Sequence, residues 1–263
     1  MTVPTEAMHD DVLDPELLER ARSLGQDAER FPVVITSGRM LGAMYSIPLE
    51  QAWALLPATE RLVPVRTTPR RAAISFFAWE VRRSGLGPYH ELGVALPVLL
   101  DVAKPPVPLH PARWRDASLG IHFVELPVDS ERCLEHGAGL LGLPHVLGEV
   151  DVDLDRTGGR ASLDYEDERM AELRVDLGRW PRERRHDLGV QAYSLLEGRI
   201  IRTRHSGVGI GYRGRRGSAA LAFGEHRRAQ RLARLSLSRR PLELRVLPRL
   251  NQVTWGPEDL GPA

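Results

Sequence analysis

Short apolar runs, rich in β-branched and aromatic residues, recur along most of this chain and are separated by turn residues. Clear examples are residues 31–37, 71–83, 89–102 and 119–128, and similar runs continue through the second half. Runs of this length and composition are typical of strands. Many strands at regular spacing with few helices predict a largely antiparallel sheet that closes or folds over on itself.

A few segments show helix signals instead. Asp14 and Pro15 have the residue types that begin a helix, and residues 46–58 carry apolar side chains at helical spacing. Residues 129–144 start with capping residues and end in glycines and a proline. We therefore expect few helices, placed around the sheet.

The chain has 263 residues, which suits one large domain. We expect a helical extension over residues 1–29, one domain over residues 30–255 and a frayed tail over residues 256–263. No apolar run is long enough to span a bilayer, and the start lacks the features of a secretory signal. With the single cysteine Cys133, these features predict a cytoplasmic protein without membrane contact.

The charged residues exclude several functions. Lys104 is the only lysine among 36 basic residues, so any mechanism that needs an amine side chain has one candidate. The basic segment 226–242 lacks interleaved aromatics and the net charge is only +1, which argues against a nucleic-acid partner. The nine histidines include no closely spaced pair, so we predict neither a metal site nor a cofactor.

Three blocks of sequence carry a family resemblance. Residues 84–98 contain a glycine turn, then Tyr89-His90-Glu91 opening a strand that ends Leu-Pro-Val, and residues 137–148 contain Gly-Leu-Pro followed by His145 and Val146. Arg39 precedes a segment that ends in Leu-Leu-Pro. With these motifs at their spacing, the chain resembles the acetoacetate decarboxylase family over residues 30–250. The resemblance implies an α+β fold, in which a curved antiparallel β-sheet or barrel encloses a central pocket and few helices lie at the periphery.

The resemblance also exposes a departure from the family's chemistry. That family uses a lysine with a lowered pKa to form an iminium with a β-keto acid, and acetoacetate decarboxylase is itself the standard example of such a lysine. The family's lysine pair falls on His145 and Val146 here. Its charged helix end reads Gly-Ala-Gly over residues 137–139, and its second pocket glutamate is Phe76. We therefore expect no amine-catalysed decarboxylation.

Three residues are the candidate catalytic groups. Glu91 shares a strand face with Tyr89 and, if that face is inward, would move protons from a pocket; otherwise it is an ordinary surface carboxylate. Arg39 would anchor a substrate carboxylate or lie on the surface among the many arginines. His145 would act as an acid or base, or would fill the space of the lost lysine as a neutral ring. The predicted substrate-binding residues are Phe76, Tyr89, Leu143 and Val146.

These residues predict a small-molecule enzyme of specialised metabolism. It would act as a non-covalent lyase, cyclase or isomerase on a largely apolar substrate with a carbonyl or carboxylate, such as a polyketide intermediate. Two alternatives stay open: a non-catalytic small-molecule-binding protein derived from a decarboxylase, and a true decarboxylase that uses Lys104. The resemblance also implies a homo-oligomer.

Overall fold

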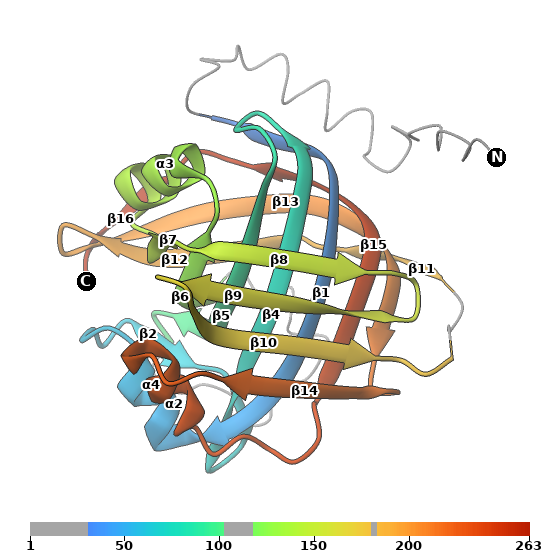
Figure 1. Cartoon of the computed structure of the whole chain (residues 1–263). Helices are drawn as coiled ribbons and strands as arrows, with labels where there is room; N and C mark the ends of the chain where they lie inside the picture. The colour runs from blue at the N-terminus through green and yellow to red at the C-terminus, as the bar shows by residue number, and fades with distance from the viewer. Residues whose placement is uncertain (1–30, 103–117, 180–182) are drawn as a thin grey trace.

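A computed structural model describes residues 31–102, 118–179 and 183–263, and Figure 1 shows their arrangement. The expected N-terminal helical extension over residues 1–29 and the single lysine, Lys104, lie outside the described residues. Within them the chain is mostly strand, with three helices: α2 Leu49–Leu55, α3 Glu131–Leu141 and α4 Arg227–Ala233. None of these helices is long and apolar enough to cross a membrane.

Twelve of the strands form one large sheet and four form a second one. The large sheet contains β1 Val33–Pro48, β2 Leu62–Pro64, β3 Arg66–Thr68, β4 Arg71–Ser84, β5 Tyr89–Leu100, β6 Leu119–Val128, β7 His145–Leu147, β11 Arg184–Asp187, β12 Val190–Leu196, β13 Arg199–Gly214, β15 Glu243–Thr254 and β16 Glu258–Pro262. The second sheet contains β8 Glu149–Leu154, β9 Gly158–Tyr165, β10 Glu168–Asp176 and β14 Ser218–Phe223.

Seven strands of the large sheet close into a ring. Their order is β5, β4, β1, β15, β13, β12 and β6, and β6 pairs back onto β5. All of these neighbours are antiparallel except β12 and β6, which run parallel at Ala192 and Ile121. A closed ring leaves its strands with no free edge and creates an interior face. The predicted α+β fold, a curved antiparallel sheet with few peripheral helices, is confirmed.

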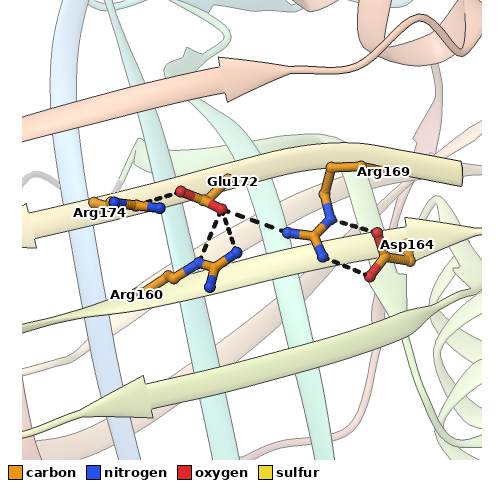
Figure 2. A network of polar contacts seen from close by, with 5 residues as sticks. All are labelled: Arg160, Asp164, Arg169, Glu172 and Arg174. Carbon is orange, nitrogen blue, oxygen red and sulfur yellow. Dashed lines mark hydrogen bonds and ion pairs between the residues drawn. The ribbon is translucent and has the colours of Figure 1, made fainter.

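The second sheet covers the outside of β1, β4 and β5 (Figure 1). Its inner face is apolar, and its outer face carries the ion-pair network of Figure 2, in which Glu172 contacts Arg160, Arg169 and Arg174, and Arg169 also contacts Asp164. The arginines of this network are 44–61% exposed, so it is a solvated surface that contributes little to stability. Because charged and apolar positions alternate along its strands, the second sheet packs its apolar face on one side of the ring and exposes its charged face to solvent.

Two apolar cores follow from strand alternation. On β4, Phe76 and Ala78 point outward into the core between the two sheets, where they join Val152, Leu163 and other residues of the second sheet. The neighbour Phe77 points inward, into the core of the ring. Because successive side chains of a strand point to opposite faces, each ring strand under the second sheet contributes to both cores.

Two sequence expectations are corrected here. The first strand runs to Pro48 rather than ending at residue 37, because it pairs with β4 on one side and β15 on the other. Gly42 permits this close pairing, since an added Cβ there would lie 3.2 Å from the Phe76 carbonyl oxygen. The tail over residues 256–263 is not frayed, because β16 (Glu258–Pro262) pairs with β13 and Arg202 binds Glu258.

Candidate active site

The ring encloses a cavity of about 500 Å³. Its wall is built from alternate positions of the ring strands, for example Ser75, Phe77 and Trp79 on β4 and Tyr89 and Glu91 on β5. The volume lies within the range of ordinary small-molecule sites, and most of the lining is apolar. The interior of the ring therefore contains a binding cavity beside its apolar core.

Helix α3 closes one end of the cavity. Ser130 caps its start by accepting a hydrogen bond from the Cys133 backbone N–H, and Gly142 ends it in the left-handed conformation. The chain then returns as β7, which pairs in parallel with β6 and places His145 beside the helix. Cys133 and His145 from these two elements thus meet Glu91 on β5.

Glu91 is the central acidic group of this end and is only 9% exposed. The Cys133 thiol donates a hydrogen bond to Glu91 Oε1, with 3.7 Å between Sγ and Oε1. Burial is the main reason that the pKa of Glu91 is raised to about 7; the thiol hydrogen bond opposes this rise and the nearby Asp129 carboxylate adds to it. Glu91 therefore exchanges its proton near neutral pH.

His145 is held as a neutral ring beside Glu91. Its Nδ1 lies 3.1 Å from the Cys133 carbonyl oxygen, which only accepts, so Nδ1 carries the proton. Nε2 is therefore unprotonated, and it lies 3.6 Å from Glu91 Oε1 without a hydrogen bond. Burial lowers the pKa of His145 to about 4, which keeps the ring uncharged at neutral pH. Of these two side chains, Glu91 is therefore the one that binds and releases a proton near neutral pH.

Three potential metal ligands meet at this point. Glu91, Cys133 and His145 each offer one potential ligand atom, and these three atoms lie within 4.8 Å of one another. Burial and the Glu91 carboxylate raise the pKa of the Cys133 thiol well above its usual range, so the thiol keeps its proton. As they stand, the three groups form a hydrogen-bonded cluster with one exchangeable proton rather than a charged ligand set.

A second polar cluster lines the cavity at β13 and β15. Arg213 and Arg245 are register partners on these strands, and both donate through Nε to Glu243, at 2.9 and 2.5 Å. The two guanidinium groups lower the pKa of Glu243, so it stays ionised. His186 on β11 lies close enough for Arg213, Arg245 and Glu243 to influence its pKa.

A third polar group is His205 on β13. Its Nδ1 lies 3.1 Å from both the Thr254 hydroxyl and the Gln252 side-chain nitrogen. Burial lowers the pKa of His205 to about 4, so the ring is neutral. All three residues line the cavity on the side formed by β13 and β15.

The structure brings together four of the seven predicted site residues. Glu91, His145, Tyr89 and Leu143 line the cavity. Tyr89 lies two residues before Glu91 on the same strand face, and burial raises the pKa of its hydroxyl well above the usual range. Glu91 and His145 thus converge on one cavity, which Arg39 does not line.

The other three predicted residues lie outside the cavity. Arg39 points away because Met40, the next residue of β1, faces inward; Arg39 instead pairs with Glu80 and donates to the Leu154 carbonyl oxygen at 2.8 Å. Phe76 lies between the sheets, with its ring 6.0 Å from that of Phe223. Val146 lies on β7 and, unlike its neighbour His145, does not line the cavity.

Several cavity residues were missed from the sequence, among them Cys133, His205, Arg213, Arg245 and Gln252. The sequence contained one signal for Arg245: it lies between Leu244 and Val246 in an otherwise apolar strand. A charged residue at such a position indicates a polar site on that face of the strand. Arg213 lies in the glycine-rich segment 206–217, most of which belongs to strand β13.

The family model described as acetoacetate decarboxylase (ADC) matches residues 22–256. No curated protein sequence matches the chain.

Three solved structures show the fold. An acetoacetate decarboxylase from Legionella pneumophila subsp. pneumophila str. Philadelphia 1 is 13% identical, with a TM-score of 0.64, 89% of this chain and 88% of that chain covered. The enduracididine biosynthesis enzyme MppR complexed with pyruvate is 15% identical, with a TM-score of 0.59 and coverage of 89% and 91%. An acetoacetate decarboxylase-like enzyme from Sphingomonas wittichii RW1 is 12% identical, with a TM-score of 0.56 and coverage of 88% and 93%.

Proposed function

The chain belongs to the acetoacetate decarboxylase family, and from this premise we propose that it is a biosynthetic enzyme that works by proton transfer without a covalent intermediate. The substrate is a largely apolar small molecule with a carbonyl or carboxylate, such as a polyketide intermediate. The reaction belongs to the lyase, cyclase or isomerase type. The substrate binds inside the ring, and Glu91 acts on it from the end that α3 closes.

The buried Glu91 beside a neutral His145 carries this proposal. A general acid or base works best when its pKa lies near the working pH, and burial raises the pKa of Glu91 to about 7. Both the carboxylate and the carboxylic acid are then populated at neutral pH. One residue can therefore remove a proton from the substrate and return it at another atom.

The step itself follows from this arrangement. The Glu91 carboxylate takes a proton from a carbon next to a carbonyl, and the electron pair of that C–H bond moves onto the carbonyl oxygen. Tyr89 on the same face keeps its hydroxyl proton, because burial raises its pKa, and the hydroxyl would turn from its contact with the Cys133 thiol to donate to that oxygen. Return of the proton to a different carbon gives isomerisation, and loss of a leaving group gives elimination.

The lack of a lysine supports a non-covalent step. The described residues contain no lysine, and the resemblance puts the family's amine position at His145, whose imidazole forms no stable imine. Biosynthetic roles are known on this fold, since MppR, an enduracididine biosynthesis enzyme, is complexed in one structure with a condensation product of pyruvate and imidazole 4-carboxaldehyde. Carbonyl chemistry in a biosynthetic setting is therefore compatible with the architecture.

A hydrogen–deuterium exchange experiment tests the proposal without knowledge of the natural substrate. A panel of apolar ketones and keto acids is incubated with the protein in D₂O, and deuterium entering next to the carbonyl is followed by NMR. We expect protein-dependent exchange for some members, lowered by about 10²-fold or more in Glu91→Gln. Glu125→Gln is the matched control, because Glu125 is a partly buried carboxylate that pairs with Arg228 outside the main cavity.

Two outcomes would favour the alternatives. Tight binding of panel members without any exchange would support a non-catalytic binding protein. Loss of carbon dioxide from a β-keto acid, unaffected by Glu91→Gln, would support a decarboxylase that uses Lys104. The predictions of a cytoplasmic location and a homo-oligomer accompany this proposal and are checked by fractionation and by light scattering.

A further inference from the structure

The arginine pair opposite Glu91 has unused hydrogen-bonding capacity. Arg213 and Arg245 each donate a hydrogen bond through Nε alone, and each bonds a different carboxylate oxygen of Glu243. Their Nη1 and Nη2 groups make no hydrogen bond with any described residue. The side chain of Arg213 is 34% exposed and that of Arg245 is 25% exposed, and both line the cavity. The Nη1 and Nη2 groups of the two guanidinium groups therefore contact the solvent in the cavity.

The charge at this place is not balanced. Two guanidinium groups share one carboxylate, which leaves one positive charge in a partly enclosed apolar space. Burial lowers the pKa of Arg245, because it removes part of the water that would otherwise stabilise the charge. A planar guanidinium fork binds a carboxylate through two parallel hydrogen bonds, and removal of bulk water strengthens that contact.

The arginine pair and Glu91 lie at different ends of the cavity. Glu91 lies under α3, whereas Arg213 and Arg245 lie near β11, and these two elements stand on opposite sides of the ring in Figure 1. Among the described groups that shift the pKa of Glu91, no arginine takes part. The two polar ends therefore act on different parts of a bound molecule.

A continuous row of apolar side chains joins the two ends. In register, Glu91 pairs with Trp79, Trp79 with Met40, and Met40 with Leu247, which stands two residues from Arg245. Three strand spacings and two residues set the backbone positions of Glu91 and Arg245 roughly 15 Å apart along the wall. Trp79, Met40 and Leu247 all line the cavity, so the wall between the ends is suited to an apolar chain.

We propose that Arg213 and Arg245 bind the carboxylate of an elongated, apolar acid whose other end reaches Glu91. This inference rests on the proposed function in taking Glu91 as the reacting end. It makes the substrate two-ended: the carboxylate is held in place and stays unreacted, while the chemistry occurs several carbons away. A short β-keto acid, with its carboxylate next to the ketone, would not reach both ends.

Binding measurements test the inference without turnover. Straight-chain carboxylates of four to twelve carbons and the matching primary amides are titrated into the protein by isothermal calorimetry at low salt. We expect the acids to bind at least about ten-fold more tightly than the amides. Affinity should rise by about four-fold per methylene and level off when the chain reaches the Glu91 end.

Variants assign the preference to the arginine pair. Arg213→Gln and Arg245→Gln should each remove most of the acid-over-amide preference, whereas Arg249→Gln should retain it, because Arg249 on the same strand pairs with Glu183 outside the cavity. Glu243→Gln should increase acid affinity, since it removes the competing carboxylate. Circular dichroism melting establishes folding, and Arg213→Gln, at the more exposed position, decides the case if Arg245→Gln does not fold.

The results separate this inference from the proposed function. Equal binding of acids and amides, or a preference that survives both glutamine variants, overturns the inference even if deuterium exchange through Glu91 is observed. Conversely, an acid preference that disappears in Arg213→Gln but persists in Glu91→Gln sustains it even if no exchange is found. Tighter binding of an alkyl phosphate than of the carboxylate of equal length would overturn the assignment of a carboxylate.

Discussion

Gly137 lies directly against the imidazole of His145. A Cβ added to Gly137 would stand 2.2 Å from both Cε1 and Nδ1 of that ring, far inside the contact distance of real atoms. The helix residue therefore has no side chain because the histidine occupies its space. The two positions form one steric unit at the end of the cavity, next to Glu91.

Substitution of Gly137 should show this coupling. Gly137→Ala should destabilise the protein by about 1–3 kcal/mol, since the ring must move from its position against the helix. In a His145→Ala background the same change should be neutral or stabilising, because alanine favours a helix and the clash is gone. Denaturant unfolding of the four variants measures the coupling energy.

Gly139→Ala is the matched control for that cycle. Gly139 lies in the same helix, and nothing lies within 4 Å of a Cβ added there. We expect it to stabilise the protein by up to about 1 kcal/mol in both backgrounds. Equal costs of Gly137→Ala with and without the His145 ring would contradict the packing described.

Glu91 should make stability depend on pH. Its pKa is about 4.5 in the unfolded chain and about 7 in the fold, so the folded protein holds the proton more tightly. The stabilisation is fully present below pH 4.5 and is lost as the pH rises to 7, by about 3 kcal/mol. Urea unfolding of the wild type and of Glu91→Gln across pH 4.5–8 measures this contribution as the difference between their unfolding free energies. The contributions of His145 and His205 occur in both proteins and cancel in that difference. A difference that does not change with pH would contradict the buried, protonated state.

Borohydride trapping should detect no imine. Treatment with acetoacetate and sodium borohydride should leave the mass of Lys104 peptides unchanged, because the resemblance puts the family's amine position at His145. An acetoacetate decarboxylase that retains its lysine, treated in parallel, should be modified. A reduced adduct on Lys104 that disappears in Lys104→Arg would restore the covalent mechanism.

Arg39 should affect stability rather than turnover. Arg39→Met removes the ion pair with Glu80 and the contact with the Leu154 carbonyl oxygen, both outside the cavity. We expect a loss of about 1 kcal/mol in unfolding free energy. Deuterium exchange rates should stay within about two-fold of wild type, and a hundred-fold loss would return Arg39 to the catalytic groups.

The sequence predicted the fold well because strand signals are local. Apolar runs and turns mark most ring strands, and the family motifs around Glu91 and Gly-Leu-Pro indicate the cavity. The helix signal over residues 46–58 was confirmed as α2, but the first strand was predicted to end at residue 37, where its apolar, β-branched run ends. The pairings of β1 with β4 and β15 extend the strand to Pro48, and such long-range pairings cannot be detected in a short window of sequence.

The site was predicted only in part, because one-residue shifts in a strand reverse the direction of a side chain. Arg39 and Phe76 each lie next to a residue that does face the cavity, Met40 and Phe77. β1 contains register irregularities on both sides of Gly38, which spacing arguments do not anticipate. The arginine pair was missed because its members, Arg213 and Arg245, come together only through the pairing of β13 with β15.

The alternation along β4 has a consequence for how such a protein evolves. Ser75, Phe77 and Trp79 shape the cavity, whereas Phe76 and Ala78 secure the second sheet from the other side of the same strand. Selection can therefore alter ligand preference at every second position while leaving the positions between them to maintain folding. A combinatorial library restricted to the cavity-facing set should yield many folded members with new specificities, whereas one over the alternate set should yield few that fold.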